Sequence, residues 1–114
     1  MHEYSIVMAL IEQCEALAKQ HHAIAVERVN IKVGILSGVE PSLLAQAFNT
    51  FKLDGLCAKA SLDMHIQPLV LQCNHCHKRT EQTQRVVLCP DCNSADTQVI
   101  DGEDMMLMQL EMDT

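Results

Sequence analysis

The sequence has few aromatic side chains and little positive charge. Its 114 residues contain no tryptophan, one tyrosine and two phenylalanines, and 8 lysines and arginines stand against 15 aspartates and glutamates. The formal net charge is −7. Proteins that hold single-stranded nucleic acid use aromatic rings to stack on bases and a basic groove to bind phosphates. The composition therefore argues against nucleic acid and anionic lipid as partners, and it favours proteins or cations.

Long apolar runs are missing as well. No stretch approaches the roughly 20 residues of a membrane-spanning helix, and residues 6–11, IVMALI, have neither the basic flank nor the small-residue cleavage site of a signal peptide. We therefore expect a cytoplasmic protein with no membrane partner. Because the cytosol is reducing, the 6 cysteines are expected to be thiols or metal ligands and not disulfides.

The periodicity of apolar side chains predicts two helices and three strands. Apolar residues at three- and four-residue spacing indicate the helices, the second of which begins at Pro41. Alternating apolar and polar residues indicate the strands, and Pro68 marks an edge position or a bulge in the second strand. The first two strands should be parallel because a helix connects them, and the third should be antiparallel. The expected helices are residues 4–20 and 41–54, and the expected strands are residues 26–36, 61–71 and 105–112.

These elements predict an α+β fold. A small mixed three-stranded sheet should carry the two helices, and a zinc-ribbon-like domain with four cysteines should be inserted into it. The cysteine-rich stretch sets the predicted boundaries. The α/β domain should comprise residues 1–72 and 97–114, and the inserted zinc-binding domain should comprise residues 73–96.

Two cysteine pairs dominate the inserted segment. Cys73 and Cys76 form one C-x-x-C pair, and Cys89 and Cys92 form a second after twelve intervening residues. A two-residue gap lets a tight turn aim both sulfurs at one ion, and a hairpin can place the second pair opposite the first. We interpret the four cysteines as ligands of tetrahedral zinc, although iron or a redox dithiol could also use such a motif. Four protein ligands leave no open position for water, so the zinc would be structural.

Other potential ligands have a plainer interpretation. His75 and His77, beside the first pair, are expected to be solvated, with exchange of one of them into the zinc shell as the alternative. Cys14 lies on the apolar face of the first helix and is assigned to the core, whereas Cys57 has no evident partner and could be exposed. The methionines of the last strand are interpreted as core side chains and not as a soft-metal site; they are Met105, Met106, Met108 and Met112.

The amino terminus is a second candidate metal site. A bulky second residue disfavours removal of Met1, so a free amine should precede His2. The amine, the amide nitrogen of His2 and its imidazole can close a five-membered and a six-membered chelate ring around one ion. Such a planar nitrogen field suits nickel(II) or copper(II). The amide of Glu3, or a carboxylate such as that of Glu3 or Glu40, could complete the shell.

Three segments together resemble one known family. MHEYS at the start, VNIKVGILSGVEPSLLAQAF in the middle and the two C-x-x-C pairs resemble the HypA/HybF family of hydrogenase-maturation nickel chaperones. The resemblance covers nearly the whole chain. It implies a metallochaperone, not an enzyme, that carries structural zinc(II) on its four cysteines and helps to insert nickel(II) into nickel-iron hydrogenase.

The resemblance also assigns residues and partners. Met1 and His2 match the nickel motif of the family, and Glu3 matches the acidic residue that follows it. Glu40 precedes Pro41 at a position where some members use an acidic residue near nickel, but it could equally cap the second helix. The implied partners are a nickel-handling GTPase and the hydrogenase large subunit, with urease maturation as a further role in some bacteria.

Two other functions stay open from the residues alone. A zinc-ribbon adaptor for nucleic acid or protein would use the cysteine pairs and the cations Lys78, Arg79 and Arg85, against the acidic character of the whole chain. An enzyme would use Cys57 or a histidine as its reactive group, but no nucleophile, base and orienting residue stand in a recognisable motif. The sequence makes no prediction of the oligomeric state.

Overall fold

The chain forms two compact units. The computed structural model describes residues 3–114, and residues 1–2 lie outside the described part. We refer to the two units as the α/β unit and the ribbon unit. The α/β unit comprises Met1–Ile31, Glu40–His65 and Met106–Thr114, and the ribbon unit comprises Lys32–Val39 and Ile66–Met105.

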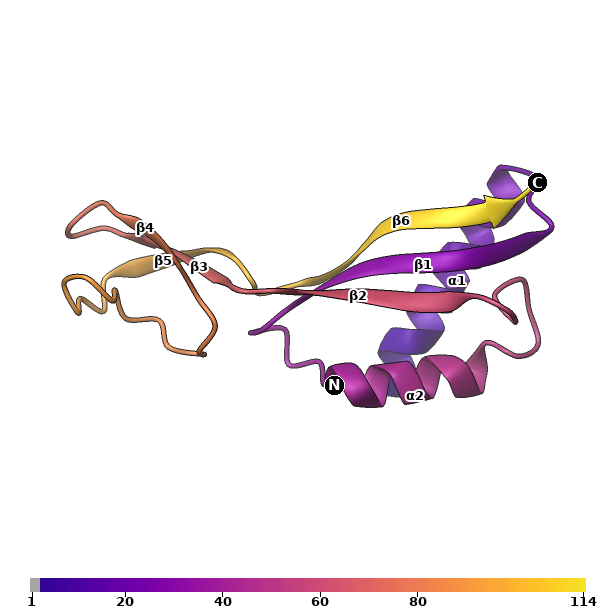
Figure 1. The fold of residues 1–114 in the computed structure, drawn as a ribbon, viewed down its shortest axis with the longest axis horizontal. Coiled ribbons are helices and arrows are strands. Elements are labelled where there is room, and N and C mark those ends of the chain that lie inside the picture. The colour runs from indigo at the N-terminus through magenta and orange to yellow at the C-terminus, as the bar shows by residue number, and fades with distance from the viewer. Residues whose placement is uncertain (1–2) are drawn as a thin grey trace. The chain divides into compact units, whose positions relative to one another are not determined.

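The described residues form two helices and six strands (Figure 1). Both predicted helices are present, and the second ends at Phe51, three residues earlier than expected. No helix of the described residues combines the length and the apolar character that a membrane crossing requires. In chain order the elements are α1 (Glu3–Gln20), β1 (Ala25–Gly34), α2 (Pro41–Phe51), β2 (Ser61–Gln67), β3 (Leu69–Cys73), β4 (Arg79–Gln82), β5 (Thr97–Asp101) and β6 (Met105–Asp113).

The first sheet has the strand order β2-β1-β6 and is mixed, as predicted. β1 is parallel to the segment that contains β2, because the N–H groups of Val26 and Ile35 donate to the carbonyls of Leu56 and Gln67, so the residue numbers increase together. β1 is antiparallel to β6. The N–H groups of Ile24 and Gly34 donate to the carbonyls of Asp113 and Asp104, so the residue numbers change in opposite directions.

The core of the α/β unit lies between the helices and the sheet. Figure 1 shows α1 crossing behind the strands. The other face of the sheet is solvated, as the alternation in β1 predicts: Arg28 of β1 pairs with Asp63 of β2 at 3.2 Å and with Glu111 of β6 at 3.3 Å. Buried residues recur at helical spacing on α1 and α2. They are Val7, Leu10, Cys14 and Ala18 of α1, Leu44, Ala47 and Phe48 of α2, and Val26, Val29 and Ile31 of β1.

The loop between α2 and β2 is held against α1. The Leu56 N–H donates to the Glu15 carboxylate at 2.9 Å. Gly55 permits this approach, because a Cβ atom at that position would collide with the same carboxylate. The loop places Cys57 in the core, and neither Cys57 nor Cys14 has any exposed surface. The core assignment of Cys14 is therefore confirmed, and the exposed position considered for Cys57 is wrong.

The ribbon unit contains a second sheet, of order β4-β3-β5, which is not among the elements predicted from the sequence. β3 pairs antiparallel with both neighbours, and its residue Gln72 lies opposite Arg79 on one side and Gln98 on the other. The single strand predicted over residues 61–71 is wrong. The chain forms two strands in two different sheets, and they separate at Pro68, which has no N–H to continue a ladder.

The ribbon unit is larger than the predicted inserted segment. Residues 73–96 lie within it, but β3 begins before them and β5 ends after them. The assignment of residues 73–96 as a separate zinc-binding domain stays a prediction. Apart from its cysteines, the unit buries four apolar side chains, those of Val33, Val39, Leu69 and Leu71.

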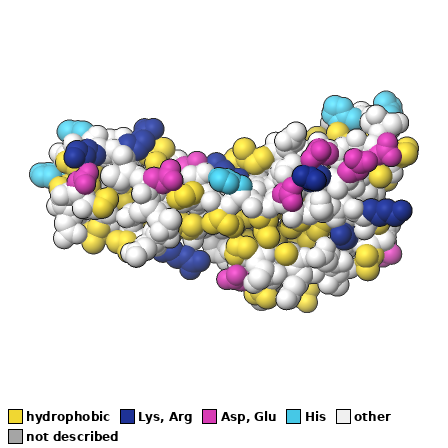
Figure 2. Space-filling view, viewed as in Figure 1, with side chains coloured by type: hydrophobic (Ala, Val, Ile, Leu, Met, Phe, Trp, Pro, Cys, Tyr) yellow, Lys and Arg dark blue, Asp and Glu magenta, His cyan; other side chains and the backbone are white. Residues whose placement is uncertain are grey.

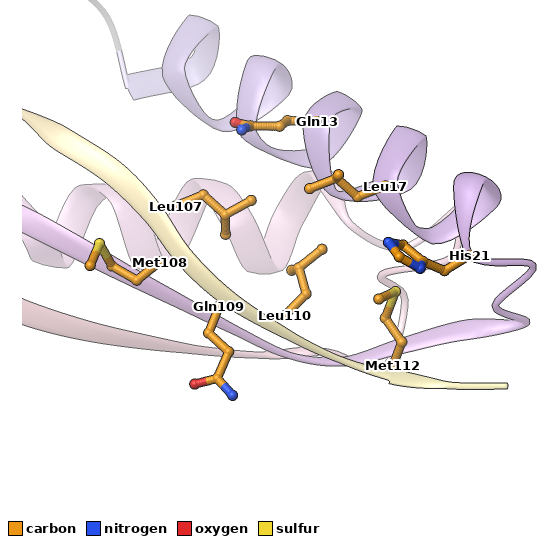
Figure 3. Close-up of a pocket in the computed structure, with 8 residues that line it drawn as sticks. All are labelled: Gln13, Leu17, His21, Leu107, Met108, Gln109, Leu110 and Met112. Atoms are coloured by element: carbon orange, nitrogen blue, oxygen red, sulfur yellow. The ribbon is translucent and has the colours of Figure 1, made fainter.

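The last strand leaves two of its methionines in solvent. Met106 and Met108 are 46% and 58% exposed, so their interpretation as core side chains is wrong. Half-buried and exposed residues alternate along β6, but the alternation is interrupted at Met108 and Gln109, which are both exposed. Leu107 and Leu110 point toward α1, whereas Gln109 points away from it (Figure 3). A hollow of about 260 Å³ lies between α1 and β6.

An ion pair joins β1 to β5 within the ribbon unit. The Lys32 ammonium lies 3.1 Å from both carboxylate oxygens of Asp101, and the Gly102 N–H donates to the same carboxylate at 2.8 Å. The hydrogen bond from Lys32 lowers the pKa of Asp101 most, and the hydrogen bond from the Gly102 N–H lowers it further. A carboxyl whose pKa is lower in the folded state stabilises the fold above its unfolded pKa. That contribution is lost as the pH falls through the folded pKa.

Asp101→Asn should therefore destabilise the protein at neutral pH, and the difference from the wild type should shrink below about pH 4. Urea unfolding at a series of pH values measures this difference. Asp63→Asn is the control, because its ion pair with Arg28 leaves 50% and 51% of the two side chains exposed and such pairs contribute little. A gap between Asp101→Asn and the wild type that stays constant on acidification would contradict the assignment.

Candidate functional site

The first cysteine pair lies on a turn at the end of β3. Cys73 is the last residue of the strand, and its N–H donates to the Lys78 carbonyl at 2.9 Å, which closes the turn. The N–H groups of His75 and Cys76 each lie 3.3 Å from the Cys73 sulfur. His77 follows with a φ of 65°, a left-handed conformation that reverses the chain toward β4. The turn thus surrounds one sulfur with backbone donors.

The second pair repeats this local geometry. The Cys89 N–H donates to the Ser94 carbonyl at 3.0 Å, again the residue five positions further on. Asn93 directly follows the pair with a φ of 61°, as His77 does after the first pair. Asparagine adopts this conformation more readily than most residues. This backbone role of His77 and Asn93 is not predicted from the sequence, although the same position directly after each C-x-x-C pair is the signal that could reveal it.

The two turns bring the four predicted cysteines together. Their sulfur atoms all lie within 4.8 Å of one another. The sulfurs of Cys73 and Cys92 are 3.5 Å apart, and those of Cys76 and Cys89 are 3.6 Å apart. A tetrahedral zinc ion with zinc–sulfur bonds of about 2.3 Å holds its sulfurs about 3.8 Å apart. The donor set and its spacing therefore fit a zinc ion.

The four thiols differ in how readily they ionise. Hydrogen bonds from the backbone of Cys76 and His75 lower the pKa of Cys73 to about 6. The Ser94 backbone acts in the same direction on Cys92, but desolvation and the neighbouring thiols outweigh it and raise the pKa of Cys92 to about 12. Four sulfurs this close cannot all carry negative charge without a cation among them. The site therefore favours a divalent cation that displaces the protons.

The cysteines and the histidines beside them differ in their exposure. Cys73 and Cys89 are buried and Cys92 is exposed. The side chains of His75 and His77 are exposed, as predicted, and exchange of either into a metal shell stays a prediction.

Basic side chains form no continuous patch on the face drawn in Figure 2, where they are scattered and lie near acidic ones. Lys78, one of the cations considered for a nucleic-acid adaptor, pairs with Asp91 at 3.4 Å.

Most of the predicted nickel ligands lie outside the described residues. Met1 and His2 fall there, and Glu3 is the first residue of α1. Glu40 occupies the N-cap position of α2, but its side chain makes no capping bond to the helix backbone. It accepts a hydrogen bond from the Ser42 hydroxyl at 3.2 Å and is exposed. A role for Glu40 near nickel stays a prediction.

Comparison with known proteins places the chain among nickel-handling factors. The family model described as "Hydrogenase/urease nickel incorporation, metallochaperone, hypA" matches residues 1–112. Hydrogenase maturation factor HypA of Shewanella sp. (strain MR-7) is 60% identical over 113 residues, which cover 99% of this chain and 96% of the relative. Hydrogenase maturation factor HypA of Aquifex aeolicus (strain VF5) is 45% identical, with coverage of 99% and 98%.

Solved structures with the same fold bear related names. The solution structure of the Ni metallochaperone HypA from Helicobacter pylori has a TM-score of 0.72 and 36% sequence identity, and the match covers 99% of this chain and 98% of that chain. A second solution structure of HypA protein has a TM-score of 0.74 and 35% identity. The predicted family and fold class are thereby confirmed. The chain belongs to the HypA family of metallochaperones for nickel incorporation into hydrogenase and urease.

Proposed function

We propose that this protein binds nickel(II) at its amino terminus and delivers it during the maturation of nickel-iron hydrogenase. Met1 and His2 would supply nitrogen ligands, and Glu3 a further ligand. The start of α1 at Glu3 supports this assignment. The first four N–H groups of a helix have no acceptor within the helix. The amide nitrogens of His2 and Glu3 can therefore bind a metal without breaking a helical hydrogen bond.

The four cysteines would hold zinc(II) as a structural ion. The observation that carries this assignment is the approach of four thiols to within 4.8 Å of one another. When bound, zinc would fill its tetrahedral shell with sulfur and stabilise the two turns, with no position left to activate water. Cys73, Cys76, Cys89 and Cys92 would then not compete for the nickel cargo, which would stay on the nitrogen ligands of the amino terminus.

A carrier must retain its ion during transit and release it to a recipient. A site with few protein ligands meets both needs, because a recipient can add its own ligands while the first ones leave. The partners in this proposal are the nickel-handling GTPase of the pathway and the hydrogenase large subunit, in the cytoplasm. The nucleic-acid adaptor is not favoured, because the chain carries a net charge of −7 and polyanion binding needs a basic surface.

An extended amino terminus tests the nickel site. A variant with a few residues added before Met1 should lose nickel binding, because the extension turns the terminal amine into an amide while every side chain stays the same. Nickel titration calorimetry on the native and the extended protein measures the affinity. Zinc content should be equal in the two proteins. Equal nickel affinity in both would show that the amine is not a ligand.

A further inference from the structure

α1 carries a second apolar stripe that its own fold leaves uncovered. Tyr4, Met8 and Ile11 follow one another at spacings of four and three residues, so they lie on one face of the helix. Tyr4 is 60% exposed and Met8 is 57% exposed. The stripe that packs on the sheet is a different one, and it includes Val7 and Leu10. The first three turns of α1 therefore present apolar side chains in two directions.

Phe51, the last residue of α2, extends this second stripe. Its ring meets the Tyr4 ring edge to face, with centroids 5.1 Å apart and an interplanar angle of 87°. It is nevertheless 42% exposed. Met8, Ile11 and Phe51 together line a hollow of about 260 Å³. We call Tyr4, Met8, Ile11 and Phe51 the helical patch; tyrosine, phenylalanine and methionine are enriched at protein interfaces.

Acidic side chains border the helical patch. Glu12 and Glu15 line the same hollow, and Glu12 is exposed. A second copy of this chain would bring another net charge of −7 against these carboxylates, which disfavours self-association there. A surface with apolar side chains at its centre and lysine or arginine at its rim would match both the patch and its border.

We propose that the helical patch is the docking surface for a protein partner in nickel transfer that presents apolar side chains rimmed by lysine or arginine. This inference rests on the proposed function. Tyr4 follows His2 by two positions, which is at most about 7 Å of extended chain. A partner seated on the patch would therefore lie beside the proposed nickel ligands. Transfer would then occur within one complex, where reacting groups are already positioned.

Two methionine variants of matched exposure test this surface. Met8→Glu places a charge in the patch, and α1 should tolerate it because Met8 is exposed and glutamate is a good helix former. Met108→Glu places the same charge on β6, where Met108 is 58% exposed against 57% for Met8. The probes are the purified nickel-handling GTPase and the purified immature hydrogenase large subunit of the same organism. We expect Met8→Glu to weaken binding to at least one of them tenfold or more, and Met108→Glu to bind both as the wild type does.

Nickel titration separates this proposal from the proposed function, because Met8→Glu should bind nickel with wild-type affinity. The docking surface is overturned if Met8→Glu binds both probes like the wild type, if Met108→Glu weakens binding equally, or if the wild type binds neither probe. Each of these results leaves the amino-terminal nickel site standing.

Glu12→Lys tests the expected charge of the partner. It should weaken the same complex and make its affinity less dependent on salt. A stronger complex would show that the rim of the partner is acidic, and the proposed partner chemistry would be wrong.

Discussion

Cys73→Ser is expected to abolish stoichiometric zinc binding and to unfold the cysteine-bearing end of the ribbon unit. Cys73 is 1% exposed, and its sulfur lies 3.3 Å from two backbone N–H groups. Metal binding contributes about 10–16 kcal/mol to the folding of small zinc peptides. The segment has little apolar burial to replace it, because Val86, Val87 and Leu88 are 42%, 44% and 37% exposed. Loss of the ion should therefore unfold the segment.

Zinc analysis and amide hydrogen exchange measure this effect together. Protection should be lost at the N–H groups of Asn74 and Cys89, which donate to the carbonyls of Asp96 and Ser94. Protection in α1 should persist, because that helix belongs to the α/β unit. Removal of zinc from the wild type by a chelator should reproduce the same pattern.

The matched control is Cys57→Ala, which removes a buried thiol from the α/β unit. It should lower the stability of that unit and leave one zinc ion per chain. Full zinc content in Cys73→Ser, or unchanged protection at Asn74, would count against a structural zinc on the four cysteines.

Local periodicity is sufficient to locate most of the α/β unit. α1 buries residues at three- and four-residue spacing, and β1 buries Val29 and Ile31 on one face, so each element shows its own period in the sequence. The grouping of the four cysteines is also local in origin. A two-residue gap forces each pair onto one turn, and only the approach of the two turns depends on the rest of the fold.

Contacts between distant segments are not visible in such patterns. Cys57 is buried because the loop before it is tied to Glu15, 41 residues from Leu56 in the sequence. β3 pairs with β5 across the entire cysteine segment, in a register that no local spacing encodes. Met106 and Met108 are exposed although their neighbours Met105 and Leu107 are half-buried. Alternation predicts two faces of a strand, but it does not predict whether a second layer covers one of them.

His2→Ala should abolish high-affinity nickel binding and leave zinc in place. The imidazole closes the larger of the two proposed chelate rings, so its loss removes a ligand and a ring at once. Changes in residues that only support a ligand typically cost 10–100-fold in metal affinity, and the loss of a direct ligand should cost more. Acidification should release nickel from the wild type for a related reason, because protons compete for the imidazole and the amine.

His21→Ala is the control, because it removes an exposed imidazole that directly follows the other end of α1. It should bind nickel as the wild type does. Nickel titration of both variants, with X-ray absorption of the loaded wild type, distinguishes the two metal sites: nickel should show nitrogen and oxygen neighbours, and zinc four sulfurs. Nickel surrounded only by sulfur, or a His2→Ala protein that retains its affinity, would move the cargo to the cysteines. A metal held by four thiolates has no open position for ligands of a recipient, so delivery would then require the ribbon unit itself to open.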